Sequence, residues 1–216
     1  MILSGLITRF SRSGLNSSGL PIRLSALSSM AIAQVEPPYA EATRAGRHFH
    51  GGTQIIANGI APVAAIPTVT ATLALYNNDV NGNGLSLVLD WLNVFLGSGT
   101  PAAGLSIFAA VGRPTTAPSA NATGYGSAAM SGTSRTSKAL WATAQTFPAG
   151  VNWSALVSTL QAAAANVGQG DNYIDLGGRI VIPPGFALGI GLLSGAGTTP
   201  LYGISAQWSE LELDLE

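Results

Sequence analysis

Apolar and polar residues alternate along most of the chain after residue 47, in short runs separated by clusters of Gly, Pro and Asn. In Thr68–Tyr76, for example, Val69, Leu73 and Leu75 share one side of an extended chain, and threonines lie on the other side. This two-residue period predicts a half-buried β-strand. The same period predicts strands over Leu105–Val111, 136–147, Tyr173–Ile182, 186–192 and 202–208.

Leu85–Leu96 differs because it is apolar on both sides. Such a segment is typical of a strand in the middle of a sandwich or at a subunit contact. Leu87, Trp91 and Trp208 are therefore expected in the core or in an interface, rather than against a ligand.

Other segments depart from simple alternation. In Asn152–Gly168, apolar residues recur at helical spacing between an N-cap Asn and a terminal Gly, which predicts one helix over about 152–168, in a connection. Residues 113–134 are rich in Pro, Thr, Ser, Ala and Gly and are expected to form a long surface loop. Gly189 and Gly191 share one side of a strand, which indicates a bulge or the close approach of another backbone. After Trp208 the apolar set moves from even to odd positions, which predicts a β-bulge near Ser209-Glu210.

About eight short strands and one helix predict a mainly β fold, a jelly-roll-like β-sandwich. We expect an extended N-terminal arm over residues 1–38 and a jelly-roll domain over residues 39–216. Residues 1–35 carry arginines but no acid, and the small residues around Ala31 and Ala33 leave a signal or organelle address open as the alternative. Arg23 interrupts the apolar core that such a signal needs, which favours an arm held by neighbouring subunits.

Charge is scarce in this chain. Charged residues make up 9% of 216 residues, against roughly 25% in an ordinary soluble domain. The 47% of hydrophobic residues argues against a disordered chain, and the few Lys and Arg argue against direct nucleic-acid binding. Zero cysteines exclude disulfides and thiolate chemistry. No apolar run approaches the roughly 20 residues of a transmembrane helix, so no membrane partner is expected. A surface this poor in charge is expected where other chains cover it, which indicates an assembly protein.

Several stretches resemble small structural proteins of tailed bacteriophages that carry a jelly-roll domain. These stretches, in chain order, are Tyr39–His50, Pro67–Asn78, Ser98–Gly104, Ile182–Leu188 and Trp208–Glu210. The resemblance spans residues 39–216 and implies a virion component, often a homotrimer, that decorates or cements a capsid or forms part of an appendage. Its partners would be copies of itself and, through the N-terminal arm, other capsid or virion proteins.

Asp79-Val-Asn81-Gly-Asn83-Gly84, followed by Asp90, fits the pattern of a calcium loop with oxygen ligands at alternate positions. Only two carboxylates are present, and a strand follows where an EF-hand needs a helix. A plain turn between two strands is the favoured interpretation, because Asn and Gly clusters are typical of such turns.

His48-Phe49-His50 places two imidazoles on one side of a strand, a spacing that can hold a transition metal. It resembles the His-x-His of cupins, which are also jelly rolls, but no Glu follows at the next ligand spacing and the chain has no third His. A polar pair near the start of a strand is the favoured interpretation, with metal binding across an oligomer axis left open.

Neither a nucleophile elbow nor a phosphate-binding glycine loop occurs in the sequence. We therefore expect no enzyme, no cofactor and no catalytic or metal-ligating residue. The alternative functions are a receptor- or glycan-binding module of a fibre or tail and, third, a cupin-like metal enzyme.

Overall fold

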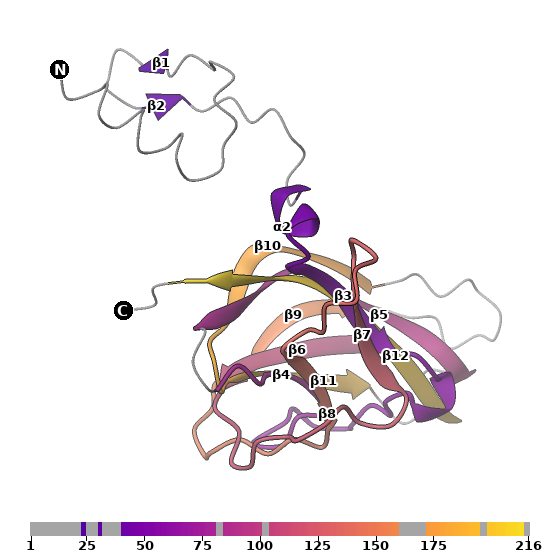
Figure 1. Ribbon diagram of the computed structural model, residues 1–216. Coiled ribbons are helices and arrows are strands. Elements are labelled where there is room, and N and C mark those ends of the chain that lie inside the picture. Colours follow the sequence, from indigo (N-terminus) through magenta and orange to yellow (C-terminus); the bar gives the residue numbers. More distant parts are fainter. Residues whose placement is uncertain are drawn as a thin grey trace. The chain divides into compact units, whose positions relative to one another are not determined.

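The computed structural model describes residues 40–80, 84–100, 104–159, 172–194 and 198–213, with two short strands before them (Figure 1). Contacts divide the chain into two units, Met1–Pro37 and Pro38–Glu216. In the first unit, β1 (Arg23–Leu24) pairs antiparallel with β2 (Met30–Ala31). The remainder of the expected arm lies outside the described residues.

The second unit is built from two five-stranded antiparallel sheets. Sheet I has the order β10-β5-β12-β3-β7, and sheet II has the order β8-β4-β11-β6-β9. The strands of sheet I are β3 (His48–Thr53), β5 (Leu85–Thr100), β7 (Tyr125–Ala129), β10 (Asn172–Ile182) and β12 (Thr198–Glu212). The strands of sheet II are β4 (Leu73–Asn77), β6 (Leu105–Gly112), β8 (Ala139–Thr143), β9 (Ser154–Thr159) and β11 (Ala187–Ser194). The short helix α2 (Ala40–Arg44) precedes β3, and the 3₁₀ turn η1 (Ile56–Asn58) follows it.

The strand order is that of a jelly roll, which confirms the predicted fold. Successive strands lie in alternate sheets from β3 to β6, and again from β9 to β12. As a result β3, β12, β5 and β10 lie side by side in sheet I, and β4, β11, β6 and β9 lie opposite them in sheet II. The β7–β8 pair is added at one edge, where β7 extends sheet I beyond β3 and β8 extends sheet II beyond β4 (Figure 1). β7 lies within residues 113–134, so the prediction of a continuous loop there was wrong.

The main core fills the space between the two sheets. It contains the alternating apolar residues of the predicted strands, including Leu73, Leu87 and Trp208, all of which are fully buried. β4 is shorter than the predicted strand over Thr68–Tyr76, because residues 68–72 form only an isolated bridge. β5 lies between β10 and β12, as its two apolar sides predicted for a strand inside a sheet.

A second apolar cluster covers the outer face of sheet II. Ala74, Tyr76 and Ala187 alternate with the inward residues of β4 and β11, and Phe147 packs over them from the segment after β8. Gly189 faces the ring of Phe147, and Gly191 faces the ring of Pro67. A Cβ at Gly191 would lie 2.3 Å from Pro67 Cγ. The close neighbours of these glycines are therefore side-chain rings and not another backbone. The pairing of β11 with β6 runs without a register shift, so these glycines mark no bulge there.

The helix predicted over 152–168 is contradicted in its first half, where Ser154–Thr159 forms β9 and pairs antiparallel with β6. The pairing shifts register between Ile107 and Phe108, so Leu156 is an extra residue. Leu156 and Val157 both pack against the core as a result. Two neighbouring apolar residues that both contact the core are typical of a helix, but here a bulge in the strand produces the same pattern. Residues 160–168 lie outside the described residues.

A bulge lies next to the position predicted near Ser209-Glu210, but the extra residue is on the partner strand and not on β12. β12 keeps its alternation and turns the side chain of Glu210 inward, with only 1% of the residue exposed. The register shift lies where Gln207 pairs with Trp91 and Trp208 pairs with Leu89. Asp90 is therefore the extra residue, and it belongs to β5. This bulge turns Trp91 to the outer side of sheet I, next to Asp90.

Candidate functional site

The outer face of sheet I carries side chains in two rows that run across the strands. In the first row, the paired positions are Asp175, Trp91, Gln207, His50 and Ala128, taken from β10 to β7. In the second row, they are Tyr173, Asn93, Ser205, Gly52 and Gly126. The aromatic side chains of these rows thus lie on β10 and β5, and the glycines and the alanine lie on β3 and β7.

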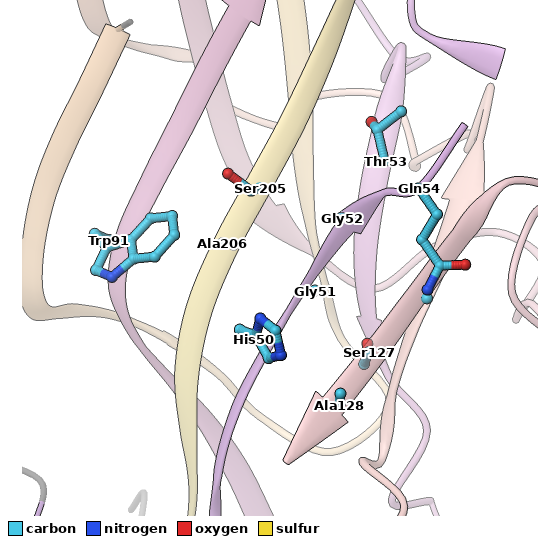
Figure 2. Close-up of a pocket in the computed structure, with 11 residues that line it drawn as sticks. His50, Gly51, Gly52, Thr53, Gln54, Trp91, Ser127, Ala128, Ser205 and Ala206 are labelled. Atoms are coloured by element: carbon cyan, nitrogen blue, oxygen red, sulfur yellow. The ribbon is translucent and has the colours of Figure 1, made fainter. Parts of the chain in front are cut away.

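A shallow depression lies over the small residues, and we call it the outer groove. Its volume is about 240 Å³, and the side chains that line it include His50, Gln54, Trp91, Ala128 and Ser205 (Figure 2). Figure 2 shows Trp91 on one side of β12 and His50 and Gln54 on the other. His50 and Gln54 are exposed, and Trp91 and Ser205 are half-buried. No lining residue of the groove is an acid, a lysine or an arginine.

Gly52 of β3 and Gly126 of β7 are among the residues that line the groove. Gly52 has φ 150°, and a Cβ there would lie 2.0 Å from the carbonyl oxygen of Ile204. A Cβ at Gly126 would lie 2.3 Å from the side-chain nitrogen of Gln54. A larger residue at Gly52 would clash with the backbone of β12, whereas the exposed Gln54 side chain that lies over Gly126 could move aside.

Trp91 and Tyr173 form an aromatic wall beside the groove. Their ring centroids are 5.8 Å apart with the planes tilted by 40°. The indole N–H of Trp91 donates a hydrogen bond to the side-chain oxygen of Gln207, which holds the ring in place. Tyr173 is 59% exposed. Trp91 is thus no part of the sandwich core, unlike Leu87 and Trp208, which are fully buried there as predicted.

The two sequence-predicted histidines lie on the same side of β3 but in different surroundings. His48 is buried, and its Nδ1 lies 2.8 Å from Ser209 Oγ and 3.5 Å from Asp90 Oδ2. His50, by contrast, is exposed at the groove. Among the described residues, no group of three acids or histidines is arranged to hold a metal ion.

Ser209, His48 and Asp90 are the residue types of a hydrolase triad, but their geometry differs from one. A triad places the hydroxyl on one imidazole nitrogen and the carboxylate on the other. Here both groups lie at Nδ1, and all three residues are buried, with at most 4% of each exposed. The cluster therefore offers no relay from carboxylate to hydroxyl and no access for a substrate. It ties β3 to β12 and β5.

Burial lowers the pKa of His48 below its ordinary value. Between that lowered pKa and the unfolded value of 6.5, the unfolded chain binds more protons than the folded one, so stability falls as the pH falls through this window. We expect the free energy of unfolding to lose this acid dependence in His48→Gln. Urea titrations between about pH 7 and pH 5 measure the effect, with His50→Gln as the exposed control. An unchanged pH profile in His48→Gln would contradict the assignment.

The predicted calcium pair Asp79 and Asp90 is not brought together. Asp79 Oδ2 accepts the backbone N–H of Leu85 at 2.8 Å, while its Oδ1 lies 3.7 Å from the Lys138 ammonium. Asp90 lies five residues after Leu85 in β5, which places it about 16 Å from Leu85 along an extended strand. Residues 81–83 lie outside the described residues. Asp79 thus acts as a turn residue that closes the loop before β5, in agreement with the favoured interpretation.

Glu210 is a buried carboxylate that joins the two sheets. Its Oε1 accepts a hydrogen bond from Ser137 Oγ at 2.7 Å and another from the backbone N–H of Lys138 at 2.6 Å. The backbone N–H of Glu210 donates to the carbonyl of Arg47 at 2.7 Å. Burial raises the pKa of Glu210, although these two hydrogen bonds and the nearby Arg135 and Lys138 act in the opposite direction. The sequence pattern singled out Glu210 only at a predicted bulge, so its structural role was missed.

The outer groove is the feature that sequence reasoning missed. Its residues come from four strands, and no local motif joins them. The available signal was the pair of polar residues Asp90 and Asn93, which enclose Trp91-Leu92 in a mostly apolar strand.

None of the helices in the described part of the chain is long and apolar enough to cross a lipid bilayer.

The chain matches no family model, no curated protein and no solved structure. The resemblance to phage structural proteins therefore rests on the stretches of sequence quoted above.

Proposed function

We propose that this chain is a non-enzymatic structural subunit that self-associates within a virion. One observation carries the proposal. From His48 to Ser134 the sequence holds three charged residues, Asp79, Asp90 and Arg113. Each of the two acids is only 4% exposed. Arg113 is therefore the one exposed charged side chain in this span of the described chain.

This distribution supports assembly because of what solvent-facing surfaces need. A soluble monomer typically carries roughly 25–35% Lys, Arg, Glu and Asp on its surface. The centres of protein interfaces are depleted of these residues, because burying an unpaired charge costs free energy. Burial of the few available charges makes the exposed surface poorer in charge than the composition already indicates.

The connection between β3 and β4 is the favoured contact region. It carries four exposed aliphatic side chains, namely Ile55 and Ile66, each 53% exposed, Val63, 40% exposed, and Ile56, 37% exposed. No charged residue occurs between His50 and Asp79. Removing such apolar surface from water yields about 25 cal/mol for each Å² buried. A neighbouring copy that covers this connection would supply the free energy of association.

The location and symmetry of the assembly are implied by the resemblance to phage structural proteins. That resemblance favours a homotrimer that decorates, cements or forms part of a capsid or appendage, with residues 1–38 reaching other virion proteins. A cupin-like enzyme has less support, because His48 faces Ser209 and Asp90 rather than a second ligand set.

Charge placed on the β3–β4 connection tests the proposal. In native mass spectrometry and light scattering of the full chain, we expect a discrete oligomer for the wild type. Ile55→Glu and Ile66→Glu should shift the mass toward the monomer, because each would bury a carboxylate in an apolar contact. Thr136→Glu is the matched control, since it adds the same charge at an exposed position beside Arg135. Electron microscopy of the purified protein then shows whether the oligomer is a closed trimer.

A wild-type chain that stays monomeric at tens of micromolar would overturn the proposal. Equal dissociation in Thr136→Glu and Ile66→Glu would place the contact elsewhere and contradict the role of this connection. Circular dichroism spectra of all variants exclude unfolding as the cause of a change in mass.

A further inference from the structure

We propose that the outer groove of sheet I binds a neutral oligosaccharide, one ring of which stacks on the aromatic wall of Trp91 and Tyr173. This inference goes beyond the proposed assembly function. It rests on residues of the strands of sheet I and, apart from Gln54, on none of the β3–β4 connection.

The aromatic wall supplies the apolar half of the recognition. Tyr173 is 59% exposed, and its ring lies 5.8 Å from that of Trp91. A sugar ring has an apolar face of C–H groups, which packs well against such a surface. The hydrogen bond from the Trp91 indole to Gln207 fixes the orientation of the wall before any ligand arrives. A preorganised ring loses less conformational entropy on binding.

The groove beside the wall supplies hydrogen-bonding groups. His50 and Gln54 are exposed at one side, and the hydroxyl-bearing Ser205 lies between them and Trp91 (Figure 2). Amide, imidazole and hydroxyl groups both donate and accept hydrogen bonds, as sugar hydroxyls require. Gly52 and Gly126 have no side chains of their own, and the exposed Gln54 side chain, which lies over Gly126, would have to move aside to admit a second ring over β3 and β7.

The charges around the groove exclude other classes of ligand. Its lining holds no Lys or Arg to pair with phosphate, and nucleic-acid binding depends on such pairs. Asp175 is exposed at the position paired with Trp91, so its carboxylate disfavours anionic ligands. The large aliphatic side chains of the surface lie elsewhere, at Ile55 and Ile66. A neutral polyhydroxy ligand fits a lining without Lys, Arg, Asp or Glu and with several hydrogen-bonding side chains.

The size of the groove indicates how such a ligand sits. Its volume of about 240 Å³ is below the roughly 300–1,000 Å³ of pockets that enclose a whole drug-sized molecule. The groove is shallow and crosses the strands β5, β12, β3 and β7. It therefore suits one or two rings of a chain that continues on both sides, rather than a single enclosed sugar.

Binding is tested with soluble hexasaccharides of glucose, mannose and N-acetylglucosamine as probes. We expect at least one of them to shift the indole N–H resonance of Trp91 in NMR spectra of the full chain, with that resonance assigned by its loss in Trp91→Phe. Isothermal titration calorimetry then gives the affinity. Tyr173→Ala should weaken binding by about tenfold, as expected for the loss of one aromatic contact, and Trp91→Ala should abolish it.

Trp153→Ala is the matched control. Trp153 is also half-buried at the surface, its ring packs against Phe147, and its indole N–H donates to the carbonyl of Thr68, far from the groove. Unchanged affinity in this variant supports the site. No resonance shift with any of the three hexasaccharides would overturn the proposal, as would equal losses in Trp91→Ala and Trp153→Ala.

The same variants separate this proposal from the assembly function. If Tyr173→Ala changes the native mass while no sugar binds, the aromatic wall is a subunit contact and the oligosaccharide site is refuted. If the wild type is monomeric while Tyr173→Ala still weakens sugar binding, the assembly proposal fails and the oligosaccharide site stands.

Discussion

Replacing Trp208 with Ala is expected to lower the free energy of unfolding by about 3–5 kcal/mol, the range for large-to-small changes of buried aromatic residues. Trp208 is fully buried. Its ring stacks on Phe49 of sheet I with centroids 6.4 Å apart, and it meets Trp141 of sheet II edge-on at 6.3 Å. The change would therefore open a cavity where the two sheets meet. Urea denaturation followed by circular dichroism measures it.

Two further variants show that this effect depends on volume rather than on a hydrogen bond. In the described part of the chain the indole nitrogen of Trp208 has no hydrogen-bond acceptor. Trp208→Phe keeps most of the ring contacts and loses no such bond, so its cost should be clearly smaller. Tyr173→Ala, at a 59% exposed position, should change stability by only about 0.5 kcal/mol. A loss below about 1 kcal/mol in Trp208→Ala, far under the range for buried aromatic residues, would contradict its place in the core.

Removal of the Glu210 carboxylate is the second change with a large expected effect. Glu210→Ala leaves the Ser137 hydroxyl and the Lys138 N–H without their acceptor. An unsatisfied buried polar group costs about 1–3 kcal/mol, and we expect the free energy of unfolding to fall by an amount in that range. Glu210→Gln retains an oxygen that accepts both bonds, so it should be at least as stable as the wild type at neutral pH.

The pH dependence of stability distinguishes the roles of charge and hydrogen bonding at Glu210. Burial raises its folded pKa above the unfolded value of 4.5. Between these two values the folded chain binds more protons, so stability rises as the pH falls from the raised pKa to 4.5 and is lost as the pH rises again. We expect this rise in the wild type and its absence in Glu210→Gln, measured as the difference between their urea titrations. Parallel pH profiles for the two proteins would refute the assignment.

His48 and Glu210 make opposite contributions on acidification. Protonation of the unfolded chain at His48 destabilises the fold, and protonation of Glu210 within the fold stabilises it. His48 pairs with Ser209, the residue before Glu210, so both groups act at the same end of β12. Comparison of each single variant with the wild type separates the two contributions.

The proposed subunit contact and the proposed sugar site use different parts of one scaffold. The jelly roll holds the aromatic wall on β5 and on the edge strand β10 of sheet I, and it presents the exposed aliphatic residues of the β3–β4 connection separately. Rigid strands position the wall more accurately than a loop does. An oligomer would repeat the groove on each copy and raise its avidity for a long polysaccharide.

The sequence by itself determined the fold class and most of the strands. Alternation of apolar residues is local information, because each side chain of a strand points to the face opposite its neighbours. This is why the core positions of β4, β11 and β12 could be predicted. The scarcity of charge is also visible without a structure, and it indicated a covered surface before the burial of Asp79 and Asp90 was known.

The tertiary structure alone decided which breaks in the alternation of apolar and polar residues are bulges, and which faces of the strands pack against each other. A bulge at Leu156 made a strand look like a helix, and a bulge at Asp90 turned Trp91 to the outer face while Trp208 stayed in the core. The pairing of β12 with β5 turned Glu210 inward, and the length of β5 separated Asp79 from Asp90. The outer groove gathers residues from four strands. Register and strand order are set by contacts between segments far apart in the chain, so no local pattern encodes them.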